Sequence, residues 1–80
     1  MQMYRKIRKD LKARGLKREE QSVIINVIQK EYEPLMQNAE HVGRTLCPKK
    51  LPYMPVVMPL LEQFGFNFEK EGEDFFIFKV

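Results

Sequence analysis

Cysteine, histidine and serine each occur once in this chain of 80 residues, and tryptophan does not occur at all. The sequence has no Cys-x-x-Cys pair, no histidine pair and no His-Glu-x-x-His run, so a zinc site has no ligand set. We interpret His41 as a helix-surface residue and Cys47 as a small core or loop residue. The four glycines are too dispersed for a phosphate-binding loop. The sequence therefore predicts no enzyme, no catalytic residue, no metal and no cofactor.

Long hydrophobic runs are missing as well. The longest mainly apolar stretch without a charge covers residues 51–61 and contains three prolines, whereas a membrane-spanning helix needs about 20 apolar residues. Residues 1–15 lack the apolar segment and the small-residue cleavage site of a secretory signal. A single cysteine cannot form an internal disulfide, which favours a reducing compartment. We therefore expect a soluble, cytoplasmic protein.

The residues that are present are typical of a folded domain. Hydrophobic residues make up 44% of the chain and charged residues 31%, close to the averages of globular proteins. A chain of this length has room for one domain, which we expect to span residues 1–80. The patterns described below predict a small α+β fold with N-terminal helices, a short proline-initiated helix and a C-terminal antiparallel β-hairpin.

Positive charge is concentrated at one end of the chain. Residues 1–18 contain eight lysines and arginines and one aspartate, a net charge of +7, so the other 62 residues carry −4. Such a basic segment is a common footprint for phosphate backbones or anionic surfaces. The alternatives are a solvated helix face or a basic arm docked on the acidic half of the molecule.

The basic segment has the periodicity of a helix over residues 1–15. Tyr4, Ile7 and Leu11 recur at spacings of three and four and form a narrow apolar stripe. On the same helical wheel four cations lie together beside this stripe: Arg5, Arg8, Lys9 and Lys12. Gly15 is suited to the left-handed position that ends a helix. With three apolar anchors this helix must dock on the rest of the molecule or become ordered on a partner.

A second helical region is predicted over residues 17–46. Pro34 removes a backbone donor, so we expect a kink or break there and two helices over 18–33 and 35–46. Five of the six residues from 23 to 28 are apolar, which is wider than one amphipathic stripe. This segment, including Val23, Ile24, Val27 and Ile28, is therefore assigned to the central core or to a dimer interface.

The C-terminal half is predicted as a proline-rich loop over 47–56, a short helix over 57–64 ended by Gly65, and a hairpin over 66–80. Two hairpin registers are open: Phe68 opposite Phe75, or, with a bulge, Phe68 opposite Phe76. The second strand has apolar side chains on both faces. Helices should cover one face, and a dimer partner or the N-terminal arm the other, so Phe76 and Phe78 join the candidate interface.

From residue 17 onward, the expected order is helix, helix, loop, short helix and hairpin, with LLEQFGF at residues 60–66 leading from the last helix into the first strand. This order is similar to that of winged-helix modules, and the resemblance implies a recognition helix in the major groove. Yet residues 54–64 offer only Glu62 and Gln63 for base contacts, and the hairpin tip is acidic. The N-terminal basic helix is therefore the expected contact with nucleic acid.

These observations predict a small nucleic-acid-binding accessory or regulatory protein, expected to be a homodimer, that makes weakly sequence-specific backbone contacts. The alternative is a small interaction module or inhibitor, of the kind found in phages and mobile elements, that covers a site on a larger acidic protein partner. The predicted phosphate contacts are Arg5, Arg8, Lys9, Lys12, Arg14, Lys17 and Arg18.

Overall fold

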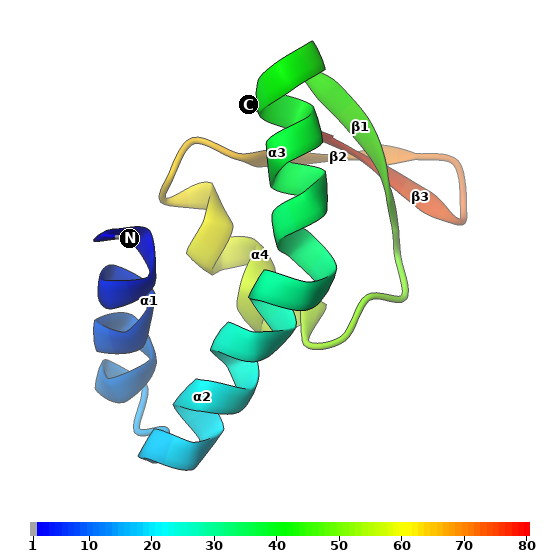
Figure 1. Ribbon diagram of the computed structural model, residues 1–80. Helices are drawn as coiled ribbons and strands as arrows, with labels where there is room; N and C mark the ends of the chain where they lie inside the picture. Colours follow the sequence, from blue (N-terminus) through cyan, green and yellow to red (C-terminus); the bar gives the residue numbers. More distant parts are fainter. Residues whose placement is uncertain (1) are drawn as a thin grey trace.

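The computed structural model describes residues 2–80 and has the predicted α+β architecture. Three helical bodies pack around one core together with a three-stranded antiparallel sheet in the C-terminal half (Figure 1). The first body is α1 (Gln2–Ala13). The second is continuous and consists of α2 (Arg18–Val27), a π-helical turn η1 (Ile28–Tyr32) and α3 (Glu33–Val42), and the third is α4 (Met54–Glu62).

Helix α1 ends as predicted, at Gly15. The Gly15 N–H donates to the Lys12 carbonyl at 3.0 Å and the Leu16 N–H to the Leu11 carbonyl at 3.2 Å, with Gly15 at φ +89°. This pair of bonds is a Schellman motif, which needs the left-handed conformation that glycine adopts without strain. Helix α2 starts at Arg18, and the backbone N–H of its N-cap residue Lys17 donates to Glu20 Oε1 at 2.8 Å.

The predicted break at Pro34 is replaced by the π-helical turn η1. The Glu33 N–H donates to the Ile28 carbonyl, five residues back, and Pro34 then lies in the first turn of α3, where its missing N–H costs little. The wider turn accommodates the proline without interrupting the helix. The perturbation therefore lies before Pro34 and not between residues 33 and 35.

The predicted helix over 35–46 and the loop over 47–56 were wrong in their bounds, because Gly43 ends α3 and a strand follows. Gly43 has φ +92° and donates to the Ala39 carbonyl at 2.7 Å. Strand β1 (Arg44–Pro48) begins at the next residue and pairs with β3. Pro48 is tolerated because β1 is an edge strand. Leu46, which continues the helical spacing in the sequence, belongs to this strand.

Helix α4 begins three residues earlier than predicted and ends at Glu62 instead of residue 64. Pro55 lies in its first turn, and Tyr53 at the N-cap has φ +58°, the one non-glycine residue with positive φ among residues 2–80. Gly65, at φ +91°, follows the helix as predicted. The Gly65 N–H donates to the Glu62 carbonyl at 3.2 Å, which again closes a Schellman motif.

Both predicted hairpin registers were wrong. Strands β2 (Asn67–Glu71) and β3 (Phe75–Lys79) place Phe68 opposite Phe78, and the sheet order is β1-β3-β2. Strand β2 extends farther than expected, which leaves a three-residue loop over 72–74. Lys49, which follows β1, closes this loop by donating its backbone N–H to the Asp74 carbonyl at 3.2 Å and its Nζ to the Gly72 carbonyl at 2.9 Å.

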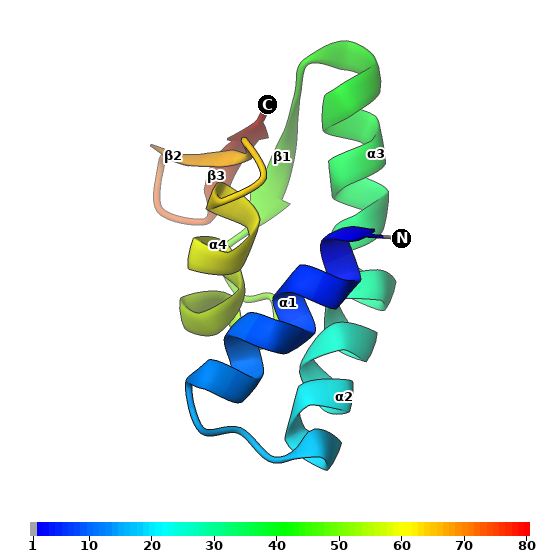
Figure 2. The same cartoon turned by 90° about the vertical axis from the view of Figure 1, so that its left-hand side faces the viewer.

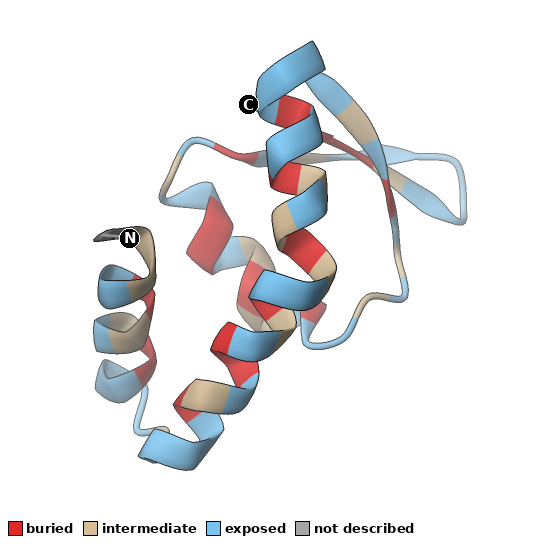
Figure 3. Cartoon of the chain, viewed as in Figure 1, coloured by how far each residue is buried: buried red, intermediate tan, exposed pale blue. Residues whose placement is uncertain are grey.

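The core lies between the helices and one face of the sheet. Fully buried members from every layer include Leu11, Ile28, Leu60 and Phe78. The Phe78 ring stacks on Phe66 at a centroid distance of 5.1 Å. Figure 3 shows the buried positions of α1 on the side turned toward the other helices. We call the sheet face that carries Phe78 and Cys47 the inner face.

Candidate nucleic-acid interface

Helix α1 is docked on the molecule and is not a free arm. Ile7 and Leu11 are completely buried in the core. The Tyr4 hydroxyl donates to Glu33 Oε2 at 2.5 Å, which ties α1 to the start of α3. Burial and this hydrogen bond raise the pKa of the Tyr4 hydroxyl, so it stays protonated and remains a donor. The apolar stripe read from the sequence is thus the docking surface of α1.

The opposite side of α1 presents a basic ridge, which we define as Arg5, Lys9 and Lys12. All three side chains are exposed. Within residues 2–80 none of them forms a salt bridge; the two bridges observed are Lys6 to Asp10 at 3.7 Å and Lys79 to Glu69. Because α1 is fixed by its buried face, the backbone that carries the ridge does not have to become ordered when a ligand binds.

Arg8 was predicted to belong to the ridge, and the structure places it between α1 and α2 instead. Its guanidinium donates to Gln21 Oε1 at 3.3 Å and to Ser22 Oγ at 3.4 Å, and the side chain is half-buried. Gln21 in turn donates to the Leu16 carbonyl at 2.9 Å. On the helical wheel Arg8 is the ridge cation nearest to the apolar stripe, so it is the one that reaches the neighbouring helix.

The other predicted phosphate contacts gather where α1 connects to α2. Arg14 lies in the turn after α1, Lys17 is the N-cap of α2 and Arg18 is its first residue, and all three are exposed. They lie beyond the C-terminal end of the basic ridge, at the bottom of the molecule as drawn in Figure 1. The predicted cations therefore form a ridge and a terminal cluster, with Arg8 held apart from both.

Half of the predicted interface residues are core residues of a single chain. Ile24, Ile28 and Phe78 are buried within the hydrophobic core, so they have no surface to offer a partner. Val23 is 46% exposed, and Val27 and Phe76 are half-buried. The sequence pattern predicted correctly that Ile24, Ile28 and Phe78 are buried, but it could not tell burial in the core from burial between two chains.

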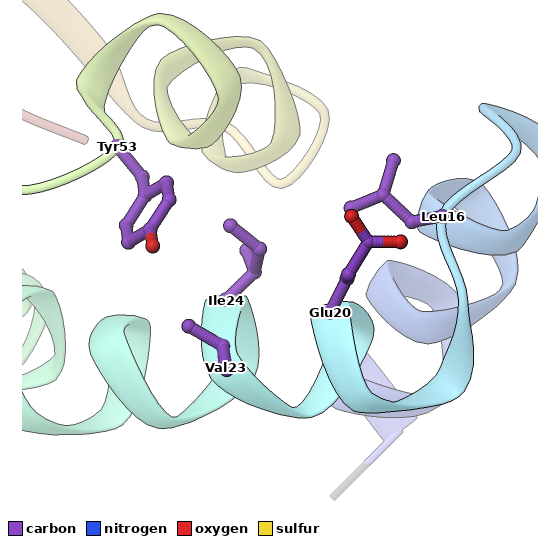
Figure 4. A pocket seen from close by; sticks show the side chains of 5 residues that line it. All are labelled: Leu16, Glu20, Val23, Ile24 and Tyr53. Atoms are coloured by element: carbon purple, nitrogen blue, oxygen red, sulfur yellow. The ribbon is translucent and has the colours of Figure 1, made fainter.

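A shallow groove that the sequence analysis missed lies between α2 and the start of α4. Figure 4 shows Val23, Ile24 and Glu20 rising from α2, with Tyr53 at one end of the groove and Leu16, beside Glu20, at the other. Its volume is about 170 Å³. The Tyr32 hydroxyl donates to the Pro52 carbonyl at 2.7 Å and thereby holds the segment before Tyr53. Nothing in the local sequence signals the positive φ that turns Tyr53 over the groove.

The structure supports the interpretation of the rare reactive residues. Cys47 is completely buried, and this burial raises the pKa of its thiol to about 11, so the nucleophilic thiolate does not form near neutral pH. His41 is exposed in the last turn of α3. Across residues 2–80, no three histidine, cysteine or carboxylate side chains come together as a metal site.

Helices α3 and α4 are separated by strand β1, whereas the two helices of a helix-turn-helix are joined by a three- or four-residue turn. In the described part of the chain, no helix has the length and apolar character needed to cross a membrane. Comparison of the sequence with protein-family models and with characterised proteins, and of the fold with solved structures, gives no match.

Proposed function

We propose that this protein is a small nucleic-acid-binding accessory or regulatory protein that places helix α1 along a phosphate backbone. The observation that carries the proposal is the division of α1 into two sides. Ile7 and Leu11 fix one side in the core, while the basic ridge on the other side is exposed and forms no salt bridge within residues 2–80. Cations on a helix fixed in this way attract phosphates, and no backbone has to become ordered on binding.

The contacts in this proposal are to phosphates and not to base edges. Lysine and arginine bind phosphate oxygens whatever the sequence, whereas base recognition requires polar side chains that enter a groove. Helix α4 has Glu62 as its one charged residue and buries Met54, Val57, Leu60 and Leu61. Binding should therefore be weakly sequence-specific and strongly dependent on salt.

The terminal cluster extends the proposed contact. Arg14, Lys17 and Arg18 follow the ridge along the chain and are exposed, so up to six cations are available from one protomer. A homodimer would double this number and bind two stretches of backbone at once. The proposal places the protein in the reducing cytoplasm, where its free, buried Cys47 stays a thiol.

The experiment that tests the proposal is a fluorescence-anisotropy titration of a labelled random duplex and a labelled single strand at two salt concentrations. We expect micromolar or tighter binding at low salt that weakens steeply as salt rises. An absence of binding to both probes at low salt would reject the proposal.

A second candidate function is an interaction module or inhibitor that covers a site on a larger protein. The groove favours this candidate, because Tyr53 and Val23 are 48% and 46% exposed beside it, and exposed tyrosine is common at protein interfaces. If this candidate is right, a pull-down from nuclease-treated lysate with the native chain recovers a partner protein in stoichiometric amount. The Tyr53→Ala variant then fails to retain that partner protein. Retention that disappears with nuclease would instead favour nucleic acid.

A further inference from the structure

The groove between α2 and α4 begins beside the terminal cluster of cations. Leu16 lines one end of the groove and stands between Arg14 and Lys17 in the chain. Glu20, which lines the same end, accepts the Lys17 backbone N–H at 2.8 Å. Figure 2 shows this connection at the lower end of the molecule, where it joins the adjacent ends of α1 and α2. The groove therefore starts next to the exposed side chains of Arg14 and Lys17.

The other end of the groove is formed by a tyrosine whose backbone is strained. Tyr53 has φ +58° and ψ +25°, a left-handed conformation that glycine and asparagine adopt at lower cost than a bulky residue. Its side chain makes no capping hydrogen bond, because the Val56 and Val57 N–H groups donate to its backbone carbonyl at 3.0 and 2.9 Å. Strain of this kind is concentrated at ligand sites. The start of α4 thus needs the conformation but not the tyrosine ring, which is 48% exposed.

The residues between the two ends favour a flat, uncharged group. Val23 and Ile24 are apolar, and Glu20 is the one charged residue among those that line the groove. The Glu20 carboxylate repels a phosphate inside the groove, whereas Arg14 and Lys17 attract phosphates just outside it. Proteins that bind single strands without sequence preference combine these two elements, cations for the backbone and an aromatic ring on which a base stacks.

We propose that an unpaired base of a single-stranded nucleic acid stacks on Tyr53 in this groove while neighbouring phosphates bind Arg14 and Lys17. The inference rests on the proposed function and adds a preference for single strands, because the bases of a duplex are already stacked and paired. The groove, at about 170 Å³, is smaller than the roughly 300–1,000 Å³ of a site for a drug-sized ligand, so it accepts one base and not several.

The spacing along α2 is compatible with one nucleotide. Val23 follows Lys17 by six residues, which corresponds to about 9 Å along the helix axis. A lysine side chain and the sugar-phosphate unit of a nucleotide together span this distance. Stacking on an aromatic ring tolerates every base, so the contact agrees with the weak sequence specificity expected of the basic ridge.

Anisotropy titrations of a labelled single strand, and of the same strand with abasic central nucleotides, test the proposal. The abasic strand keeps every phosphate and loses only the bases. The native chain binds the intact strand at least about fivefold more tightly than the abasic strand. Tyr53→Asn binds the two strands with nearly equal affinity and keeps the native affinity for a duplex. Tyr53→Phe keeps the ring and therefore keeps the preference for the intact strand.

The variants are chosen so that the fold is preserved. Asparagine adopts a positive φ readily, and the hydrogen bonds at the start of α4 come from the backbone of residue 53, so Tyr53→Asn keeps the helix. Its urea midpoint is measured beside that of the native chain. The matched control is Phe75→Asn, which removes an aromatic side chain that is 41% exposed at the start of β3. This control keeps the native preference for the intact strand.

The outcomes separate this inference from the proposed function. A native chain that binds the duplex but does not distinguish the intact from the abasic strand overturns the stacking contact alone. A chain that binds none of the probes rejects both. Equal losses of preference in Tyr53→Asn and Phe75→Asn overturn the assignment to the groove. If Tyr53→Asn keeps the preference and instead loses a protein recovered from nuclease-treated lysate, the occupant of the groove is a protein and the proposal is wrong.

Discussion

Replacing the basic ridge by alanine gives the most direct test of the phosphate contact, because the structure fixes how many cations are lost. The change is Arg5→Ala with Lys9→Ala and Lys12→Ala. All three side chains are exposed and α1 is held by buried residues, so the fold should keep its stability to within about 0.5 kcal/mol. Any large loss of affinity then reports the loss of contacts and not unfolding.

The magnitude follows from counterion release. The logarithm of the binding constant falls with the logarithm of salt concentration by about 0.9 for each phosphate neutralised on duplex DNA. If the ridge and the terminal cluster of Arg14, Lys17 and Arg18 each supply three contacts, raising salt from about 50 to about 200 mM weakens native binding about 2,000-fold. With the ridge removed, three contacts are left and the same change weakens binding about 40-fold.

Anisotropy titrations at several salt concentrations give this slope for the native chain and the triple variant. A matched control replaces Lys30, Lys50 and Lys70 by alanine, which removes the same charge from exposed positions outside α1. We expect the control to keep the native slope. Equal slopes for the two triple variants would refute the reasoning, because binding would then depend on net charge alone and not on the ridge.

Three other predictions concern the fold. Tyr32→Phe removes the hydrogen bond to the Pro52 carbonyl and should lower the free energy of unfolding in urea by about 1 kcal/mol; an unchanged midpoint would contradict this expectation. Gly65→Ala imposes φ +91° on a residue with a Cβ and should cost about 1 kcal/mol by the same assay, although the space around it is open, and Gly65→Asn should cost less. Because the pKa of Cys47 is raised from 9.0 to about 11 in the folded state, the unfolded thiol ionises first and stability falls as the pH rises above 9. Cys47→Ala should lessen that loss, and rapid alkylation of the native thiol at neutral pH would contradict its burial.

The features that the sequence predicted correctly depend on neighbours along the chain. The apolar spacing of Ile7 and Leu11 and the glycines at 15 and 65 act within one or two helical turns, and α1 and both helix ends follow from them. Strand β1 was missed because its partner β3 lies about 30 residues away and because Leu46 happens to fit a helical spacing. The α+β class is confirmed, while these long-range pairings were not accessible from local pattern.

The errors in register and in interface residues have one physical origin. The hairpin loop is closed by Lys49, a residue from outside the hairpin, so the hairpin sequence alone does not determine where β2 ends. In the same way, Ile24 and Phe78 are covered by the chain's own helices and sheet. Arg8 is a further example. The sequence predicted it as a phosphate contact, but in the folded chain its guanidinium joins α1 to α2.

The π-helical turn before Pro34 sets the rotational phase of one half of the long helix relative to the other. Helix α2 faces α1, and α3 faces β1 and β3. A turn with hydrogen bonds five residues apart holds about one residue more than an α-helical turn. In a regular helix without that residue, α3 would be rotated by about 100° relative to α2, and Met36 and Ala39 would turn away from the core. This one turn therefore determines how the basic helix and the sheet are oriented to each other, although neither contains any of its residues.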